Sequence, residues 1–410
     1  MVFDSYLEGD VAQNRHTAVV RLCMTTRRRT IAAIFGTRPD TIKLAPIILE
    51  LRKHPMIFRV VTIATAQHRQ MLDQVLEVFG IKPDYDLNIM EPRQSLARLT
   101  KNTLGALDAT LERTHPDLVL VQGDTTTTFV GSLAAFYRHI PVGHVEAGLR
   151  THNKTSPFPE EINRRLTSCI ADLHFAPTKT AERALLDENI PADRIFVTGN
   201  SVIDALKLAV RRGHRFGDPC LNEVVQDRRT IILLTMHRRE NWGKPMSGAC
   251  KAVAKLARRY PEHRFVFPVH LNPVVREVVY PILRPLKNVL LVEPLPYVDF
   301  ANLMARSHLI LTDSGGIQEE GPSLGKPVLV LRTVTERPEA VEYGTVKLVG
   351  LEQSAIMASA RRLLDDRSEY QRMASATNPY GDGYASRRTV HALQYFFGFT
   401  KRKPQEFSPR

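Results

Sequence analysis

Ionisable side chains follow apolar runs at several places in the first half of the chain. Arg38, His68, Asp124 and Glu146 each come shortly after a run that is typical of a buried strand. Two further carboxylates, Glu160 and Glu161, lie at a helix start that is marked by prolines. In an open α/β sheet, residues placed after the strands gather at one edge, where ligands bind. Carboxylates gathered there could transfer protons at carbon, one removing a weakly acidic C–H proton and another protonating a leaving oxygen.

Each of these carboxylates also has a purely structural interpretation. Asp124 could cap the helix that begins at Thr125. Glu160 or Glu161 could simply complement the partial positive charge at a helix N-terminus. The placement of ionisable residues after strands in both halves of the chain favours a site over separate structural roles.

The second half of the chain carries His237, Arg238 and His270 at equivalent positions after apolar runs. Taken singly, His68 and His270 could be polar residues satisfied by hydrogen bonds. No group of His, Asp or Glu has the spacing of a metal site, and no nucleophile elbow is present. The sequence therefore predicts an acid–base site without a metal.

A turn with two glycines, Gly315 and Gly316, follows the apolar run 309–311 and leads into a helix-compatible stretch. Glycines let backbone N–H groups approach a ligand closely, and a helix N-terminus favours an anion, so the turn suits a phosphate or diphosphate. Glu320 could then accept hydrogen bonds from ribose hydroxyls. Taken alone, the segment could also be an ordinary strand-to-helix turn.

Short apolar strands alternate with helical patterns in two separate blocks, which predicts an α/β protein with two doubly wound domains facing a cleft. The strands expected in the two blocks are 30–35, 59–64, 117–121, 140–145, and then 231–235, 265–270, 289–292, 309–311 and 326–331. The expected domain organisation is a disordered extension 1–28, a first Rossmann-like domain 29–200 joined by a last helix 385–400, a second domain 201–384, and a tail 401–410. Residues before Met24 are expected to be dispensable.

Composition narrows the functional classes. The chain has 410 residues, 43% of them hydrophobic, and a formal net charge of +13, with its basic residues in small groups rather than in one stripe. A basic surface that favours anionic metabolites is the preferred interpretation, and nucleic-acid binding is not expected. No stretch of about 20 apolar residues is present, so no membrane span is expected. Four scattered cysteines indicate a reduced, cytoplasmic protein.

Taken together, the motifs resemble those of one family. In chain order they are 35–39, 67–69, 123–128, 144–150, 159–161, 237–240 and 313–320. From about Ile31 to about Leu393, the chain resembles the non-hydrolysing UDP-N-acetylglucosamine 2-epimerases of bacteria. The resemblance implies two Rossmann-like domains of the GT-B type, a UDP-sugar substrate, a homodimer and no cofactor. It implies reversible conversion of UDP-GlcNAc to UDP-ManNAc, through elimination of UDP to 2-acetamidoglucal and its re-addition, supplying sugars for cell-surface polysaccharide.

The resemblance also assigns roles to residues. Those implied in catalysis are Asp124, Glu146, Glu160, Arg164 and His237. Those implied in binding UDP are Arg38, Lys43, Phe300, Ser314, Gly315, Gly316, Glu320 and Arg337. Those implied in holding a second, regulatory UDP-GlcNAc are Gln67, Gln70, Arg93, Arg238 and His270.

The chain departs from the family pattern at four positions. Asp40 stands where glutamate is usual, Gly321 replaces alanine, and Leu295 occupies a position that is often polar. Met236 stands where a small residue normally precedes His237, and its long side chain is expected to crowd the cleft there. These departures bear on substrate choice, so a 2-epimerase for a modified UDP-hexosamine, such as a diacetamido uronate, stays open. Two different functions, those of a GT-B glycosyltransferase and of a non-catalytic sugar-nucleotide sensor, also stay open.

Overall fold

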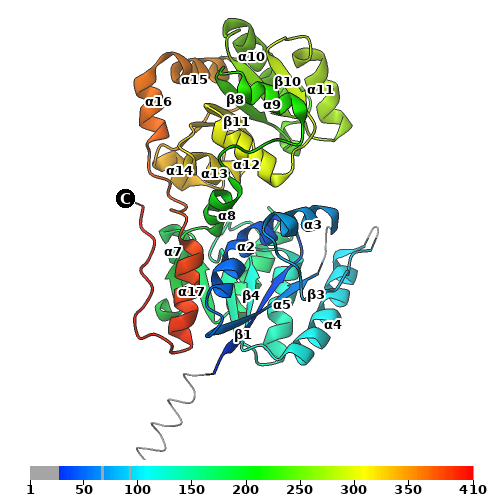
Figure 1. Ribbon diagram of the computed structural model, residues 1–410, viewed down its shortest axis with the longest axis vertical. Coiled ribbons are helices and arrows are strands. Elements are labelled where there is room, and N and C mark those ends of the chain that lie inside the picture. The colour runs from blue at the N-terminus through cyan, green and yellow to red at the C-terminus, as the bar shows by residue number, and fades with distance from the viewer. Residues whose placement is uncertain (1–26, 66–68, 92–93, 410) are drawn as a thin grey trace, which may run out of the picture. The chain divides into compact units, whose positions relative to one another are not determined.

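The computed structural model describes residues 27–65, 69–91 and 94–409. Nearly all of the expected N-terminal extension lies outside the described residues, as do Gln67, His68 and Arg93. The side chain of Gln70 is not described. The chain divides into two compact units (Figure 1). The first runs to Thr198 and takes in Tyr384–Glu406, and the second spans Gly199–Gly383 and the chain end from Phe407.

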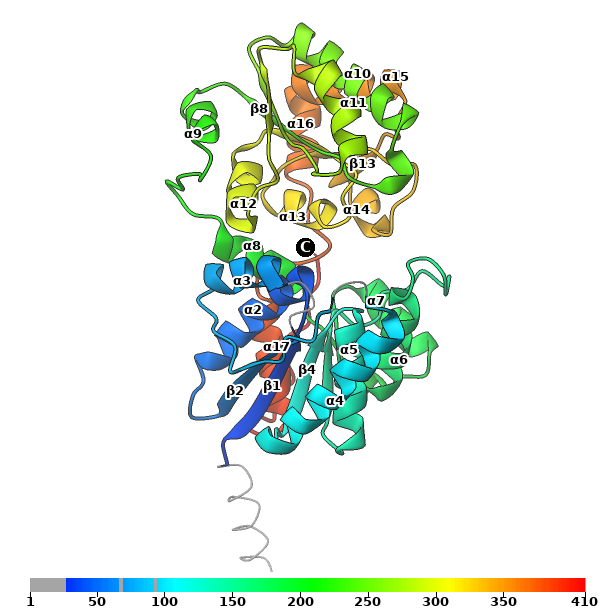
Figure 2. The same ribbon diagram turned by 90° about the vertical axis from the view of Figure 1, so that its right-hand side faces the viewer.

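The first unit is built on a parallel sheet of seven strands in the order β3-β2-β1-β4-β5-β6-β7. The strands are β1 (Arg29–Phe35), β2 (Phe58–Ala64), β3 (Tyr85–Asp86), β4 (Leu118–Gln122), β5 (Val142–Val145), β6 (Leu173–Ala176) and β7 (Ile195–Val197). The helices are α2 (Arg38–Arg52), α3 (Arg69–Val78), α4 (Leu96–Thr114), α5 (Thr126–Tyr137), α6 (Glu160–Ile170), α7 (Lys179–Asp187) and α17 (Ala385–Phe396). Helices α2, α3 and α17 cover one face of the sheet and α4, α5 and α6 the other (Figure 2). Because both faces are covered, the central strands are continuous apolar runs.

The strand order of this sheet reverses between β1 and β4, which makes that point its topological switch point. A glycine is required where the chain leaves β1, because a Cβ on Gly36 would lie 2.1 Å from the hydroxyl oxygen of Thr65. The turns after β1, β4 and β5 carry Arg38, Asp124 and Glu146. The fold therefore brings these positions to one edge of the sheet.

The second unit contains a parallel sheet of six strands in the order β10-β9-β8-β11-β12-β13. The strands are β8 (Ile231–Thr235), β9 (Arg264–Pro268), β10 (Val289–Val292), β11 (Leu309–Thr312), β12 (Val328–Val330) and β13 (Val346–Leu348). The helices are α8 (Ser201–Ala209), α9 (Pro219–Gln226), α10 (Lys244–Arg259), α11 (Pro273–Leu283), α12 (Tyr297–Arg306), α13 (Ile317–Ser323), α14 (Pro338–Glu342), α15 (Gln353–Asp365) and α16 (Arg367–Ala374). The switch point lies between β8 and β11, where His237 and the Gly315-Gly316 turn follow the two strands.

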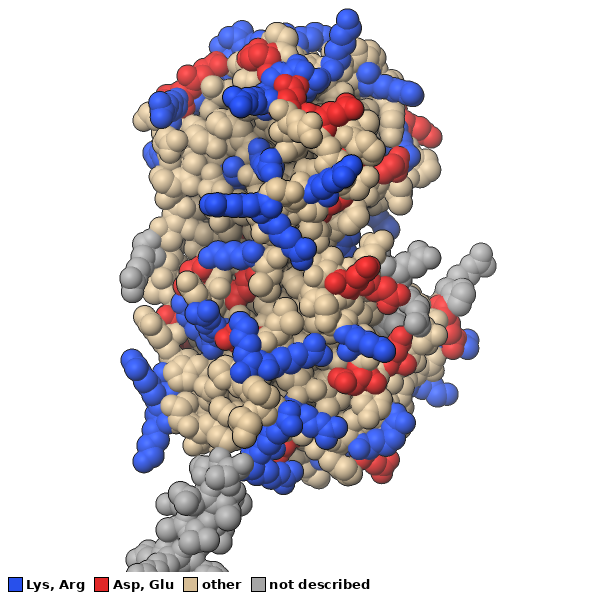
Figure 3. All heavy atoms as spheres, in the orientation of Figure 1, with Lys and Arg blue, Asp and Glu red and all other residues tan. Residues whose placement is uncertain are grey.

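The predicted α/β class with two doubly wound, parallel sheets is confirmed. Every strand predicted from an apolar run is present, with ends that differ by a few residues. The segment 201–226, expected to be helical and then polar, forms the separate helices α8 and α9. In the part of the chain that the structure describes, no helix is long and apolar enough to cross a membrane. On the face shown in Figure 3, Lys and Arg are interspersed with Asp and Glu over both units instead of forming one basic stripe.

Candidate functional site

The position of Asp124 is determined by the turn between β4 and α5. Gly123 ends the strand in the left-handed region, with a φ of 72°, and turns the chain toward the helix. The N-cap of α5 is Thr125, whose hydroxyl oxygen accepts a hydrogen bond from the backbone N–H of Thr128. The interpretation in which Asp124 caps this helix is therefore wrong, and its carboxylate is available for another role.

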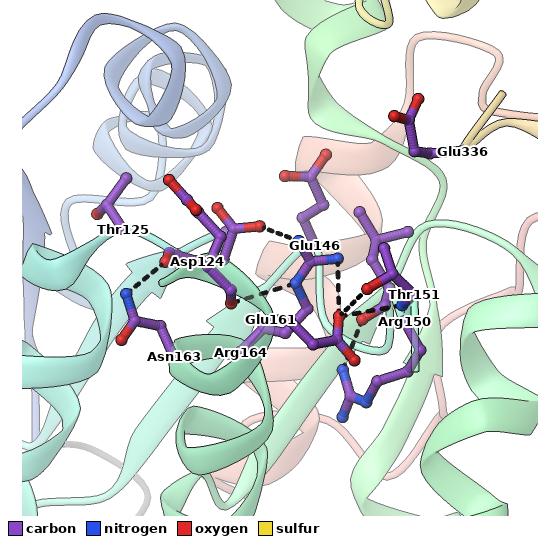
Figure 4. Close-up of polar contacts among 12 residues, drawn as sticks. Asp124, Thr125, Glu146, Arg150, Thr151, Glu161, Asn163, Arg164 and Glu336 are labelled. Atoms are coloured by element: carbon purple, nitrogen blue, oxygen red, sulfur yellow. Dashed lines mark hydrogen bonds and ion pairs between the residues drawn. The ribbon is translucent and has the colours of Figure 1, made fainter. Parts of the chain in front are cut away.

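The Asp124 carboxylate meets an arginine from the next helix on this face. The Arg164 guanidinium lies 2.8 Å from it, and the Asn163 amide donates to the Asp124 backbone carbonyl at 3.0 Å (Figure 4). Loss of hydration raises the pKa of Asp124, and the negative charges of Glu146 and Glu160 raise it further, outweighing the opposite effect of Arg164 and Lys43. A carboxyl group with a raised pKa suits proton transfer near neutral pH.

Glu146 follows β5 in a strained conformation. Its φ is 62°, in the left-handed region that residues with a side chain rarely adopt, and only 9% of its surface is exposed. The carboxylate lies 2.5 Å from the Lys43 ammonium and accepts a hydrogen bond from the Gln122 amide at 2.6 Å. Strained backbone held by surrounding contacts is common at active sites. Lys43, expected to bind UDP, thus also pairs with an expected catalytic carboxylate.

The adjacent glutamates at the start of α6 have different surroundings. Glu161 is buried and accepts hydrogen bonds from the backbone N–H groups of Thr151 and His152 and from the Thr151 hydroxyl. It therefore anchors the loop that precedes the helix. Glu160 is only partly buried, and its charge acts on Asp124. We call Asp124, Glu146 and Glu160 the carboxylate cluster, because the charges of the two glutamates act on Asp124. Glu161 instead lies 3.7 Å from the Arg164 guanidinium.

Asp40, which stands in place of the usual glutamate, has a structural role. Its carboxylate accepts hydrogen bonds from the backbone N–H groups of Gly36, Thr37 and Thr41, and it forms a capping box with Thr37, the N-cap residue of α2. Burial raises its pKa to about 6 in spite of these bonds. Arg38 is the first residue of the helix that this cap begins.

In the second unit, a buried aspartate arranges His237. The Asp313 carboxylate, which is fully buried, accepts hydrogen bonds from the backbone N–H groups of His237 and Arg238 and from the Asn241 amide. It also lies 3.2 Å from Nδ1 of the His237 ring. Burial raises the pKa of Asp313, but its bonds with His237 and its neighbours outweigh this and hold the pKa low. With Nδ1 facing Asp313, Nε2 is the ring nitrogen that can contact a ligand. No pattern in the sequence indicated that Asp313 is the partner of His237.

The Gly315-Gly316 turn also has the expected position after β11. Gly316 is the N-cap residue of α13, and no side chain of the described residues caps this helix. The largely buried Glu320 carboxylate accepts a hydrogen bond from the Tyr297 hydroxyl at 3.4 Å. Ser314 and Phe300 are half-buried in the same unit.

Arg337, expected to bind UDP, is held by a buried carboxylate. Its guanidinium donates to Glu319, whose other oxygen accepts from the Asn200 amide at 2.7 Å. Arg337 is the residue before α14, so the ion pair fixes the start of that helix.

Two of the expected regulatory residues, Arg238 and His270, lie beside residues of this unit that are expected to act on the substrate. The rings of His237 and His270 stack with their centroids 6.4 Å apart. A methyl group on Gly315 would lie 3.6 Å from Arg238. Arg238 therefore adjoins the turn expected to hold the diphosphate, and His270 adjoins His237.

Two departures from the family pattern have a physical explanation in the second unit. Met236 is 1% exposed and packs into the hydrophobic core, so the expectation that it crowds the cleft near His237 is wrong. Side chains alternate between the faces of a strand and its extension, and this one points inward. At Gly321, an added Cβ would lie 2.7 Å from Val328 and 3.1 Å from Ile310, so α13 packs closely on β11 and β12 because the residue is glycine.

Two parallel, doubly wound sheets with charged residues at both switch points define an α/β protein of the GT-B type. The profile of the UDP-N-acetylglucosamine 2-epimerase family matches residues 49–394. The chain belongs to this family, as the resemblance of its motifs predicted.

Similar proteins agree with this assignment. A UDP-N-acetylglucosamine 2-epimerase of Bacillus subtilis (strain 168) is 56% identical over 382 residues, which cover 93% of this chain and 99% of the relative. The crystal structure of UDP-GlcNAc 2-epimerase from Neisseria meningitidis bound to UDP-GlcNAc is 52% identical, with a TM-score of 0.79 over 89% of this chain and 99% of that one. The Methanocaldococcus jannaschii enzyme in complex with UDP-GlcNAc and UDP is 33% identical, with a TM-score of 0.73 and the same coverage.

Proposed function

We propose that this isomerase interconverts UDP-GlcNAc and UDP-ManNAc by eliminating UDP and adding it back. The carboxylate cluster of the first unit supports the proposal, because Asp124 pairs with Arg164, Glu146 pairs with Lys43, and the charges of Glu146 and Glu160 act on Asp124. Membership of the epimerase family and the UDP-GlcNAc bound by the Neisseria relative support the choice of substrate.

The proposed reaction has two halves. A carboxylate removes the C2 proton while the bond between C1 and the UDP oxygen breaks, which gives 2-acetamidoglucal and UDP. A carboxyl group then returns a proton to the opposite face of C2, and the UDP oxygen re-forms its bond to C1. No ketone lies beside C2, so departure of the leaving group must contribute as much as base strength.

The remaining proposed roles follow from charge. Arg38, Lys43 and His237 would stabilise the negative charge that develops on the departing diphosphate. Arg164 would keep Asp124 in place, because it pairs with that carboxylate at 2.8 Å. The residues proposed to hold UDP in the second unit are Phe300, Ser314, Gly315, Gly316, Glu320 and Arg337.

Epimerisation in D₂O is expected to place deuterium at C2 of the product. A carboxylate must take the C2 proton, and an acid that has exchanged with solvent must return one. NMR spectroscopy of the product, formed from UDP-GlcNAc by the purified protein, measures the replacement. Product that keeps its C2 hydrogen would exclude the proposed elimination. If the protein turns over a modified UDP-hexosamine but not UDP-GlcNAc, the modified sugar is the substrate.

We further propose that a second UDP-GlcNAc regulates the enzyme, held by Gln67, Gln70, Arg93, Arg238 and His270. Amides suit a sugar, and arginines with a histidine suit a diphosphate. Arg238 and His270 adjoin Gly315 and His237, which supports communication with the substrate site. A ligand of this kind acts through its differential affinity for two states of the enzyme.

Regulation predicts that forward rates are sigmoidal in UDP-GlcNAc. UDP-ManNAc alone should turn over poorly until a little UDP-GlcNAc is added, and His270→Ala should make the forward curve hyperbolic. Steady-state kinetics in both directions test this. Hyperbolic curves for the wild type in both directions, unchanged by Gln70→Ala, would reduce these residues to the wall of the substrate site.

The proposal also covers the location of the enzyme, the use of its product and its oligomeric state. We place the enzyme in the cytoplasm, as a supplier of ManNAc-type sugars for cell-surface polysaccharide. We also propose a homodimer, since Phe136 and Tyr137 at the end of α5 are 57% and 61% exposed.

A glycosyltransferase is the candidate from another reaction class, and transfer of the sugar to an added acceptor without C2 exchange would favour it.

A further inference from the structure

A fully buried histidine adjoins the turn that carries Asp124. His144 is on β5, two residues before Glu146, and its Nε2 is 2.7 Å from the carbonyl oxygen of Gly123. A carbonyl oxygen can only accept, so Nε2 carries the proton and donates it. Nδ1 is then unprotonated in the neutral ring, and it is buried without a hydrogen-bond partner among the described residues.

The chemistry of this imidazole excludes an acid–base role. Burial lowers the pKa of His144 to about 3, in spite of the hydrogen bond to Gly123. The ring is therefore neutral at physiological pH and works as a fixed hydrogen-bond donor.

The bond closes a clamp on the turn that carries Asp124. The ladder between β4 and β5 ends at the pair Gln122 and Val145, so the carbonyl of Gly123 lies beyond it. The Gly123 N–H donates to the Val145 carbonyl at 2.9 Å, and the Gly123 carbonyl accepts from His144. Both polar groups of this glycine are thus bound to the strand that leads to Glu146.

We propose that His144 is a positioning residue of the epimerase, which fixes the Gly123 turn and thereby sets Asp124 relative to Glu146. The inference rests on the proposed function for its consequence in catalysis. Its structural part, the placement of Asp124 by the imidazole, stands on the geometry of the first unit alone.

The neighbouring strand supplies a matched control. His174 on β6 lies directly opposite His144 in the sheet register and is also fully buried. Within the described part of the chain, its ring nitrogens form no hydrogen bond with Gly123, Asp124 or Glu146. Replacing either histidine removes a buried imidazole, but only one replacement removes the clamp.

The test compares His144→Gln with His144→Met. Both side chains have similar length, but only the glutamine amide can donate from the position of Nε2. We expect Met to lower kcat by about 10²-fold, because small misplacements of a catalytic group can cost this much, with UDP affinity nearly unchanged. Gln should restore most of the activity, and His174→Met should keep the wild-type kcat. Equal kcat values for Gln and Met, or an equal loss in His174→Met, would overturn the proposal.

Two further measurements separate folding and function from positioning. If the Met variant fails to fold, His144→Asn replaces it, since its shorter amide stops short of Gly123 and should cause the same loss of kcat. Crystal structures of wild type, Met and Gln variants decide the structural part even if UDP-GlcNAc is not turned over. Displacement of the Asp124 carboxylate from Arg164 in Met, and not in Gln, supports positioning; an unmoved carboxylate in Met contradicts it.

Discussion

Asp124→Asn is expected to lower kcat by about 10²–10⁴-fold, which is the usual contribution of a general acid or base. The amide keeps the size of the carboxyl group but cannot exchange a proton with the substrate. UDP affinity, measured by calorimetry, should change little, because the residues proposed to hold the UDP moiety do not include Asp124. Glu146→Gln should behave in the same way.

Asp108→Asn is the matched control for this variant. Asp108 also pairs with an arginine, Arg138, through two hydrogen bonds, but it lies on the surface away from the cluster. Its replacement should leave kcat at the wild-type value. A wild-type rate in Asp124→Asn would contradict the acid–base role of Asp124, and its ion pair with Arg164 would then be purely structural.

Gly148→Ala is expected to destabilise the first unit by about 3–5 kcal/mol, at the severe end for a single substitution. An added Cβ would lie 2.2 Å from the backbone carbonyl oxygen of Ala181, and backbone cannot move aside as a flexible side chain can. The φ of 90° adds strain for any residue with a side chain. In a unit of this size the thermal midpoint should fall by roughly 10 °C, as measured by circular dichroism.

Gly80→Ala separates the clash from the strain. Gly80 has a φ of 61°, also in the left-handed region, but an added Cβ would meet no atom within 4 Å. Its replacement should cost about 1 kcal/mol, the usual cost of this conformation for an L-residue. Equal midpoints for the two variants would show that the backbone near Ala181 yields.

The sequence allowed most of the sheet to be predicted because the central strands are buried on both faces. Four strands of the described residues were not predicted. Three of them, β3, β7 and β13, contain only two or three residues and end a sheet, and β6 includes the polar His174. Short strands of this kind take their structure from pairing with a neighbour, and that pairing has no local signal.

For the site, candidate residues could be proposed from the sequence, but the side chains that pair with them could not. Arg164 reaches Asp124 across 40 positions of sequence, and Lys43 reaches Glu146 across 103. Such pairs depend on how strands and helices are ordered in the sheet. The left-handed backbone of Glu146 has no sequence signal either, because glutamate rarely adopts it.

The close packing at Gly321 has an evolutionary consequence. Alanine at this position would press its methyl group against Val328, so the substitution alone should be unfavourable. It becomes acceptable together with a smaller residue on β12, which would make room for the methyl group. Positions 321 and 328 are therefore expected to change as a pair among related sequences. An ancestor that carried only one of the two changes would have been less stable than a chain with both or neither.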